Sequence, residues 1–344
     1  PWGLQLVNDA TVIQQIGHIG IIFLLFLLGL NLQPSQLLHM FRAALVVTLV
    51  SSAVFGGLGF VIGWLFGYSL YECIVLGAVM MFSSTIIGLK LLPTTALHHR
   101  QVGQVMISIL LLQDIIAIAI LLFLEGFSTS GIEWQLAGRL AVAVPLLVVA
   151  AFVFERYVLQ HLMQRFDTIK EYIFLTAIGW CIGIAQLADF IGLSYETGAF
   201  IAGVSLATSP ISLYIAESLK PLRDFFLIMF FFSLGASFNI TVLPDIFIPA
   251  MILAAVMLAI KPFVFSKLLA ATGESGSLPT EVGVRLGQIS EFSLLIAVLA
   301  LNTGAIGTKV SYLIQAATLI TFIVSAYIIM LNYPTPIAVS DRLR

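Results

Sequence analysis

The chain has 344 residues and a formal net charge of −2; 9% of its residues are charged and 60% are hydrophobic. A soluble domain has about 25% charged residues, so these values and the mean hydropathy of +1.10 exclude an ordinary soluble protein. They predict an integral membrane protein. The absence of a basic excess also argues against a nucleic-acid partner, because binding a phosphate backbone depends on Lys and Arg.

Apolar segments long enough to cross the bilayer as helices, which takes about 20 residues, recur along the whole chain. They are too long and too uniformly apolar for the strands of a membrane barrel. Eleven spans are predicted: Ile13–Leu32, Ala43–Phe66, Tyr71–Leu92, Gln104–Glu125, Leu136–Leu159, Glu171–Phe190, Tyr195–Thr208, Leu222–Asn239, Ile246–Leu269, Glu281–Leu301 and Val310–Leu331.

Basic residues predict the orientation, because loops rich in Lys and Arg stay in the cytoplasm. If Pro1 lies outside, the outer loops hold only Arg139 and Lys309, while the opposite loops and ends hold most of the other basic residues. This distribution predicts a multi-pass protein of the cell inner (plasma) membrane with a cytoplasmic C-terminus.

Three consecutive spans recur later in the chain. The two trios begin near Ala43, Tyr71 and Gln104 and, roughly 200 residues later, near Ile246, Glu281 and Val310. The offset is seven spans, so the trios run in opposite directions. Inverted repeats of this kind are common in secondary transporters, which bind their substrate where the two repeats meet.

The middle span of each trio has small and polar residues at its centre. They are Phe82-Ser83-Ser84-Thr85-Ile86 and Gly287-Gln288-Ile289-Ser290-Glu291. Where a membrane helix is interrupted, its freed backbone groups need such partners. The same residues also suit close helix packing or bonds to their own backbone, and this alternative stays open.

Two ionisable residues lie deep within apolar segments. Asp114 is near the middle of its span, where a carboxylate costs about 2.5 to 3.5 kcal/mol and marks a functional site. Lys261 lies mid-span in the second trio and needs a counter-charge. Asp114 is its expected partner, and a purely structural ion pair is the alternative. Arg285 and Glu291 could meet only if the helix breaks at Gln288, and either support the site or form a structural salt bridge.

Other classes of function fit the residues less well. A channel needs a filter of carbonyls or charge rings, and one Asp paired with a Lys is a poor filter. A membrane enzyme needs a nucleophile and a base, and no His lies mid-span near Ser84. Cys73 and Cys181 lie alone in apolar runs, which is not typical of a disulfide or a zinc site.

These motifs together resemble the monovalent cation/proton antiporter-2 family, above all the Kef-type potassium/proton antiporters. The likeness covers essentially the whole chain. It rests on Gly20–Leu30, Ser83–Thr85, Leu112–Asp114, Gly198–Gly203 and Gly287–Phe292. The resemblance implies an all-α integral membrane protein with an inverted-repeat, sodium/proton-antiporter-like fold and two crossing broken helices. Family members have thirteen helices, so two would precede Pro1.

The resemblance also implies roles for single residues. Asp114 carries the proton or the monovalent cation, and Gln113 fills the preceding position, which holds Asp or Asn in other branches. Members with an amide before a single carboxylate tend to exchange one ion for one proton. Lys261 matches the lysine that pairs with the carboxylate. The residues expected near the ion are Ser84, Thr85 and Gln288.

The expected organisation comes from the same likeness. Residues 1–338 form the transmembrane antiporter domain, with core helices near 71–125 and 246–302 beside a scaffold that makes a homodimer. Residues 339–344 begin a cytoplasmic extension, which in Kef-type proteins leads to a nucleotide-binding regulatory domain and can involve an ancillary subunit. K⁺ and H⁺ are the expected substrates, with no cofactor. Na⁺/H⁺ exchange and a ligand-gated, channel-like K⁺ efflux system are the alternatives.

Overall fold

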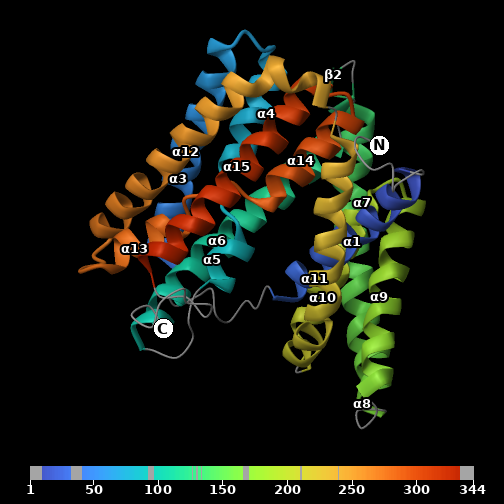
Figure 1. The fold of residues 1–344 in the computed structure, drawn as a ribbon. Coiled ribbons are helices and arrows are strands. Elements are labelled where there is room, and N and C mark those ends of the chain that lie inside the picture. The colour runs from blue at the N-terminus through green and yellow to red at the C-terminus, as the bar shows by residue number, and fades with distance from the viewer. Residues whose placement is uncertain are drawn as a thin grey trace. The chain divides into compact units, whose positions relative to one another are not determined.

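The computed structural model of the chain describes residues 10–31, 41–91, 97–125, 127–128, 131–132, 134–165, 170–209, 211–238 and 240–333. Its helices are α1 (Ala10–Asn31), α3 (Phe41–Leu65), α4 (Leu70–Met80), α5 (Thr85–Lys90), α6 (Leu97–Glu125), α7 (Trp134–Phe154), α8 (Gln160–Arg165), α9 (Lys170–Phe190), α10 (Tyr195–Ala207), α11 (Ser212–Ser237), α12 (Leu243–Ala271), α13 (Leu278–Arg285), α14 (Glu291–Asn302) and α15 (Thr308–Asn332) (Figure 1). A π-helical turn, Glu155–Leu159, joins α7 to α8, and a 3₁₀ turn, Ile240–Val242, precedes α12. Strands β1 (Phe127–Ser128) and β2 (Gly131–Ile132) pair.

Each of the eleven predicted spans coincides with a helix or with two half-helices, so the prediction of an all-helical membrane fold is confirmed. Within the described part of the chain, six helices are long and apolar enough to cross a membrane, and three shorter apolar helices accompany them. The predicted ends at Leu32, Leu92 and Asn239 lie outside the described residues, as does the predicted extension 339–344.

Contacts divide the chain into two compact units. The first comprises Pro1–Gln36 and Ile132–Asn239, and the second comprises Leu37–Gly131 and Ile240–Arg344. Both predicted trios, α3 to α6 and α12 to α15, belong to the second unit. The expectation that the remaining helices form a dimerisation scaffold stays a prediction.

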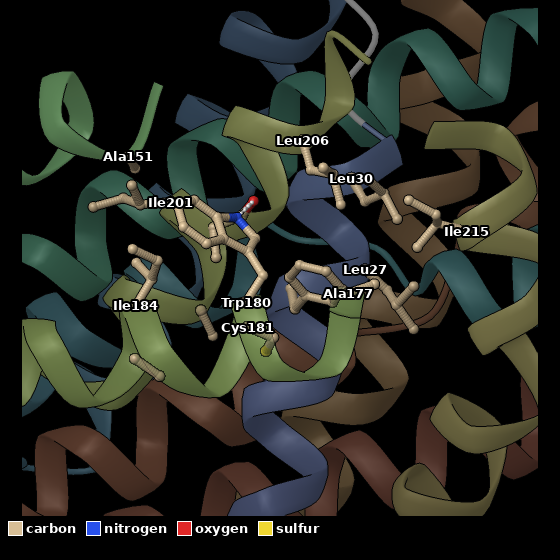
Figure 2. Packing of buried hydrophobic residues seen from close by; sticks show 14 of the residues in the cluster. Leu27, Leu30, Ala151, Ala177, Trp180, Cys181, Ile184, Ile201, Leu206 and Ile215 are labelled. Carbon is tan, nitrogen blue, oxygen red and sulfur yellow. Dashed lines mark hydrogen bonds between the residues drawn. The ribbon is translucent and has the colours of Figure 1, made fainter. Parts of the chain in front are cut away.

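The first unit packs around α10, which contacts α1, α7 and α9. Trp180 of α9 lies among buried aliphatic side chains from several of its helices (Figure 2), and its indole Nε1 donates to the carbonyl of Ala202 at 3.1 Å. Helices α1 and α10 approach closely because each has a glycine at the contact. A Cβ atom on Gly203 would overlap the carbonyl oxygen of Phe26, and one on Gly29 would overlap that of Phe200.

Gly203→Leu is expected to destroy the folded first unit, because its side chain would force α1 away from α10. Overpacking usually costs about 1 to 3 kcal/mol where side chains can shift, and here the obstacle is backbone. The measurements are thermal unfolding and size-exclusion chromatography in detergent. Gly183→Leu is the matched control, since no atom lies within 4 Å of a Cβ placed there. Equal melting temperatures for the two variants would contradict this account of the contact.

The second unit contains the two trios, each with a broken middle helix. In the first trio, α3 packs on α4 and α6, and the middle span is divided into α4 and α5 by residues 81–84. In the second, α12 packs on α13 and α15, and residues 286–290 separate α13 from α14. The prediction of two interrupted helices is confirmed. Helices α3 and α12 also contact each other, and they run side by side in Figure 1.

One end of α4 is tied to α15 by Glu72. Ser69 and Glu72 form a capping box at the start of α4. The other carboxylate oxygen of Glu72 accepts from the N–H of Gly307, the residue before α15, at 3.2 Å. Nearby, Lys309 donates to Asp245 at 2.7 Å. One carboxylate thus caps two helices of different trios.

Candidate ion-binding site at two broken helices

Gln113 of α6 holds the first break. Its Nε2 donates to the carbonyl of Met81 and its Oε1 accepts from the N–H of Ser83, both at 3.0 Å. These backbone groups have no helical partners because the helix is interrupted between α4 and α5. The side-chain amide replaces those bonds, as backbone groups at membrane depth require. Gln113 therefore fixes the shape of the break, whatever further part it has in binding an ion.

Helix α15 holds the second break in a corresponding way. The Thr321 hydroxyl accepts from the N–H of Ile289 at 3.2 Å, and the Ser325 hydroxyl donates to Oε1 of Gln288 at 3.0 Å. Ser290 then caps α14 by accepting from the N–H of Phe292. In both trios, side chains of the third member bond the break in the second.

The two breaks are also bonded directly to each other. Two hydrogen bonds join them: from the Ser83 hydroxyl to the Leu286 carbonyl at 2.8 Å, and from Gln288 Nε2 to the Ser84 carbonyl at 3.2 Å. A third joins the adjoining half-helices, from the Ser293 hydroxyl of α14 to the Val79 carbonyl of α4 at 2.5 Å. The bonded residues are 203 to 214 positions apart in the chain. The polar centres of the two middle spans thus form one assembly.

Lys261 of α12 joins the same assembly, but not in the way that the sequence suggested. Its side chain is fully buried, and Nζ donates to the carbonyls of Phe82 and Gln288 at 2.5 and 3.1 Å. No ion pair links Lys261 to Asp114, although both are among the described residues. The expected pairing is wrong for this conformation. Carbonyls at an interrupted helix carry partial negative charge, and one from each break satisfies the ammonium.

Asp114 lies in α6 directly after Gln113, and only 3% of it is exposed. Its carboxylate makes no hydrogen bond or ion pair with any residue that the structure describes. Helix α14, which begins with the buried residue Glu291, packs on α6. An ionised carboxylate can only accept. A buried one in this position can be neutralised by binding a proton or a cation.

Ser84 and Thr85 lie where the first break ends and α5 begins. The Ser84 hydroxyl accepts from the N–H of Ile87 at 3.2 Å. The hydroxyl oxygen of Thr85 is buried and has no hydrogen-bond partner in the described part of the chain. Of the two hydroxyls predicted near the ion, that of Thr85 is therefore the one with no hydrogen-bond partner among the described residues. Whether Ser84, Thr85 and Gln113 bind the ion stays a prediction.

Arg285 has a partner that sequence reasoning missed. It is fully buried at the end of α13, where Nε forms an ion pair with Glu281 at 2.9 Å and Nη1 donates to the carbonyl of Leu91 at 2.9 Å. The spacing of four residues between Glu281 and Arg285 on one helix was the available signal. Arg285 therefore joins α13 to the end of α5.

An all-helical membrane unit with two three-helix repeats, each broken at its middle helix, defines the class of secondary transporters built from inverted repeats. Profile comparison agrees: the family described as "Sodium/hydrogen exchanger, transmembrane" matches residues 1–330. The chain belongs to this family. The family is one of transporters.

Relatives and solved structures are consistent with this assignment. K(+) efflux antiporters 4 and 6 of Arabidopsis thaliana are 30% and 28% identical to the chain, over 94% of its length in each case. The alignments cover 56% and 55% of those proteins, so the chain spans about half of their length. The fold is similar to the sodium proton antiporter MjNhaP1 from Methanocaldococcus jannaschii, with a TM-score of 0.65, 17% identity, and coverage of 94% of this chain and 88% of that one.

Proposed function

We propose that the protein exchanges K⁺ for H⁺ across the membrane by alternating access, with Asp114 as the group that binds either ion. The observation that carries this proposal is the buried carboxylate of Asp114, which has no partner among the described residues and lies next to two interrupted helices. The relatives named K(+) efflux antiporters favour K⁺ over Na⁺.

Exchange results from the cost of moving an uncompensated charge. An ionised Asp114 without a counter-charge is unfavourable in a buried site. Binding one proton or one K⁺ neutralises it, so the loaded site changes its access more readily than the empty one. A single carboxylate that takes one ion at a time gives a ratio of one to one, which is electroneutral.

The environment of the transporter is part of the same proposal. We place the protein in the inner (plasma) membrane as a homodimer, with the C-terminus in the cytoplasm. A nucleotide-binding domain or an ancillary subunit would act on it from that side. The substrates are K⁺ and H⁺, and no cofactor is assigned.

The test is proton flux in proteoliposomes that contain the purified protein and a trapped pH-sensitive dye. Adding K⁺ is expected to change the internal pH, and clamping the membrane voltage is expected to leave the rate unchanged. A response to Na⁺ or Li⁺ but not to K⁺ would overturn the substrate assignment. Flux that needs no counter-gradient and does not saturate would instead indicate a channel.

A further inference from the structure

A pocket of about 540 Å³ lies in the first unit, at the π-helical turn that joins α7 to α8. Its volume falls in the range of about 300 to 1,000 Å³ that is usual for small-molecule sites. Most of its lining side chains are polar: they are Glu155, Arg156, Tyr157, Gln160 and Thr208, with Phe152 and Val153 as the apolar part. Neither the packing of the first unit nor the candidate ion-binding site accounts for this group of side chains.

Glu155 is the buried acidic residue of the pocket, with 1% of it exposed. Its carboxylate Oε1 accepts from Nε2 of Gln160 at 2.9 Å, and no other hydrogen bond or ion pair reaches that carboxylate from the described residues. The N–H of Gln160 bonds the carbonyl of Glu155 five residues back, and π-helical turns of this kind often occur at functional sites. A neutral amide does not balance a buried negative charge, which needs a cation.

The end of α10 also favours a cation in this pocket. Thr208 directly follows the last residue of α10, and a helix carries partial negative charge at that end. Helices α7 and α10 contact each other, so the carboxylate of Glu155 and the end of α10 line the same pocket. The Thr208 hydroxyl donates to the carbonyl of Ser205 at 3.1 Å, and its oxygen can still accept from a ligand.

Arg156 supplies a group of the opposite charge. It is exposed, and its guanidinium forms no ion pair or hydrogen bond with any residue that the structure describes. It does not pair with Glu155, because adjacent residues on a helix do not face each other. A guanidinium binds a phosphate through two parallel N–H donors. The pocket therefore has a place for a cation and a place for an anion.

The surface beside the pocket is apolar. Val153, Phe154 and Val158 are 51%, 47% and 43% exposed, and they belong to the span Val142–Met163, which is long and apolar enough to cross a membrane. Tyr157 is 74% exposed, and tyrosines are enriched where a membrane meets water. A molecule in this pocket thus has its charged part on polar groups and an apolar surface next to it.

We propose that the pocket binds the headgroup of phosphatidylethanolamine, with the ammonium on Glu155 and the phosphate on Arg156. This headgroup has one cation and one phosphate, which match the two places in the pocket. Phosphatidylcholine has no N–H that could donate to the carboxylate, and phosphatidylglycerol has no cation. The acyl chains would lie on Val153 and Phe154. The basic-residue distribution predicts that this end of α7 faces the cytoplasm, so the lipid belongs to the cytoplasmic leaflet.

Native mass spectrometry of the unaltered, delipidated protein in detergent tests the proposal without measuring transport. Phosphatidylethanolamine, phosphatidylcholine and phosphatidylglycerol with identical acyl chains are added in turn. The first should bind more than about tenfold tighter than the other two, because each of them lacks a charge-assisted bond to Glu155. Equal affinity for the three lipids would overturn the proposal. Equally tight binding of soluble glycerophosphoethanolamine, which has the headgroup without acyl chains, would overturn the assignment to a lipid.

Variants of the two charged residues locate the site. Glu155→Gln should remove the preference for phosphatidylethanolamine over phosphatidylcholine, while Arg156→Gln should weaken the binding of both, since both carry the phosphate. Glu171→Gln and Arg165→Gln are the matched controls, because these residues are exposed and lie outside the pocket. An unchanged preference in Glu155→Gln would overturn the assignment. The inference is independent of the proposed function, and absence of K⁺/H⁺ exchange would affect only the latter.

Discussion

Asp114→Asn is expected to abolish K⁺-driven proton flux while the protein still folds. The amide keeps the shape of the side chain, but it has no negative charge that a proton or a cation could neutralise. The neutral amide is less costly to bury than an uncompensated carboxylate, which costs about 2.5 to 3.5 kcal/mol on insertion scales, so the melting temperature should be unchanged or higher. The measurement is dye-reported flux in proteoliposomes together with thermal unfolding of the same preparation.

The matched control for this variant is Asp245→Asn. Asp245 is also a carboxylate of the second unit, but its side chain is 58% exposed and is paired with Lys309. It should retain exchange close to that of the unaltered protein. Full flux with Asp114→Asn would remove Asp114 from the site, and loss of flux in both variants would point to a general effect of acidic residues.

Lys261→Met is expected to lower the stability of the second unit strongly. The two carbonyls that Nζ bonds, from Phe82 and Gln288, would both become unsatisfied, at about 1 to 3 kcal/mol each. Relief of the cost of burying the ammonium offsets part of this, so a net loss of about 2 kcal/mol is expected. Thermal unfolding in detergent measures it as a fall in melting temperature.

Lys267→Met on the same helix is the control, because Lys267 is exposed and its ammonium lies over the ring of Phe263. It should change the melting temperature little. If Lys261→Met were as stable as this control, the two carbonyl bonds would not hold the breaks together. If, in addition, this equally stable variant lost K⁺/H⁺ exchange, Lys261 would act on the ion and not on the fold.

Hydropathy was enough to predict the helices, and the family resemblance decided that both middle helices are interrupted. Each span removes about twenty apolar residues from water, which is the largest free-energy term in a membrane chain. The small and polar residues around Ser83 and Gln288 marked the positions of the interruptions, although the same residues also suit close helix packing. These features are local in sequence, so a single sequence reveals them without an alignment of relatives.

The partners of the buried charges were harder to predict, since they depend on distances between distant segments. Lys261 was assigned to Asp114 because opposite charges attract, but backbone carbonyls at an interrupted helix compete for the ammonium and are invisible in a sequence. Gln113 was assigned to the ion, which stays a prediction, and the bonds of its amide to backbone groups in the first break were not foreseen. The Glu281 partner of Arg285 was detectable from spacing alone.

The bonds between the two breaks restrict which changes in length this chain can tolerate. Each residue added to a helix advances the rest of that helix by about 1.5 Å and rotates it by about 100°. One residue inserted into α4 would carry Ser83 away from Leu286 and Val79 away from Ser293, breaking contacts to a segment that had not moved. An insertion between Gly273 and Gly276, both at positive φ in the turn before α13, would leave every one of those contacts in place. Natural length variation should therefore collect in such turns and avoid the half-helices.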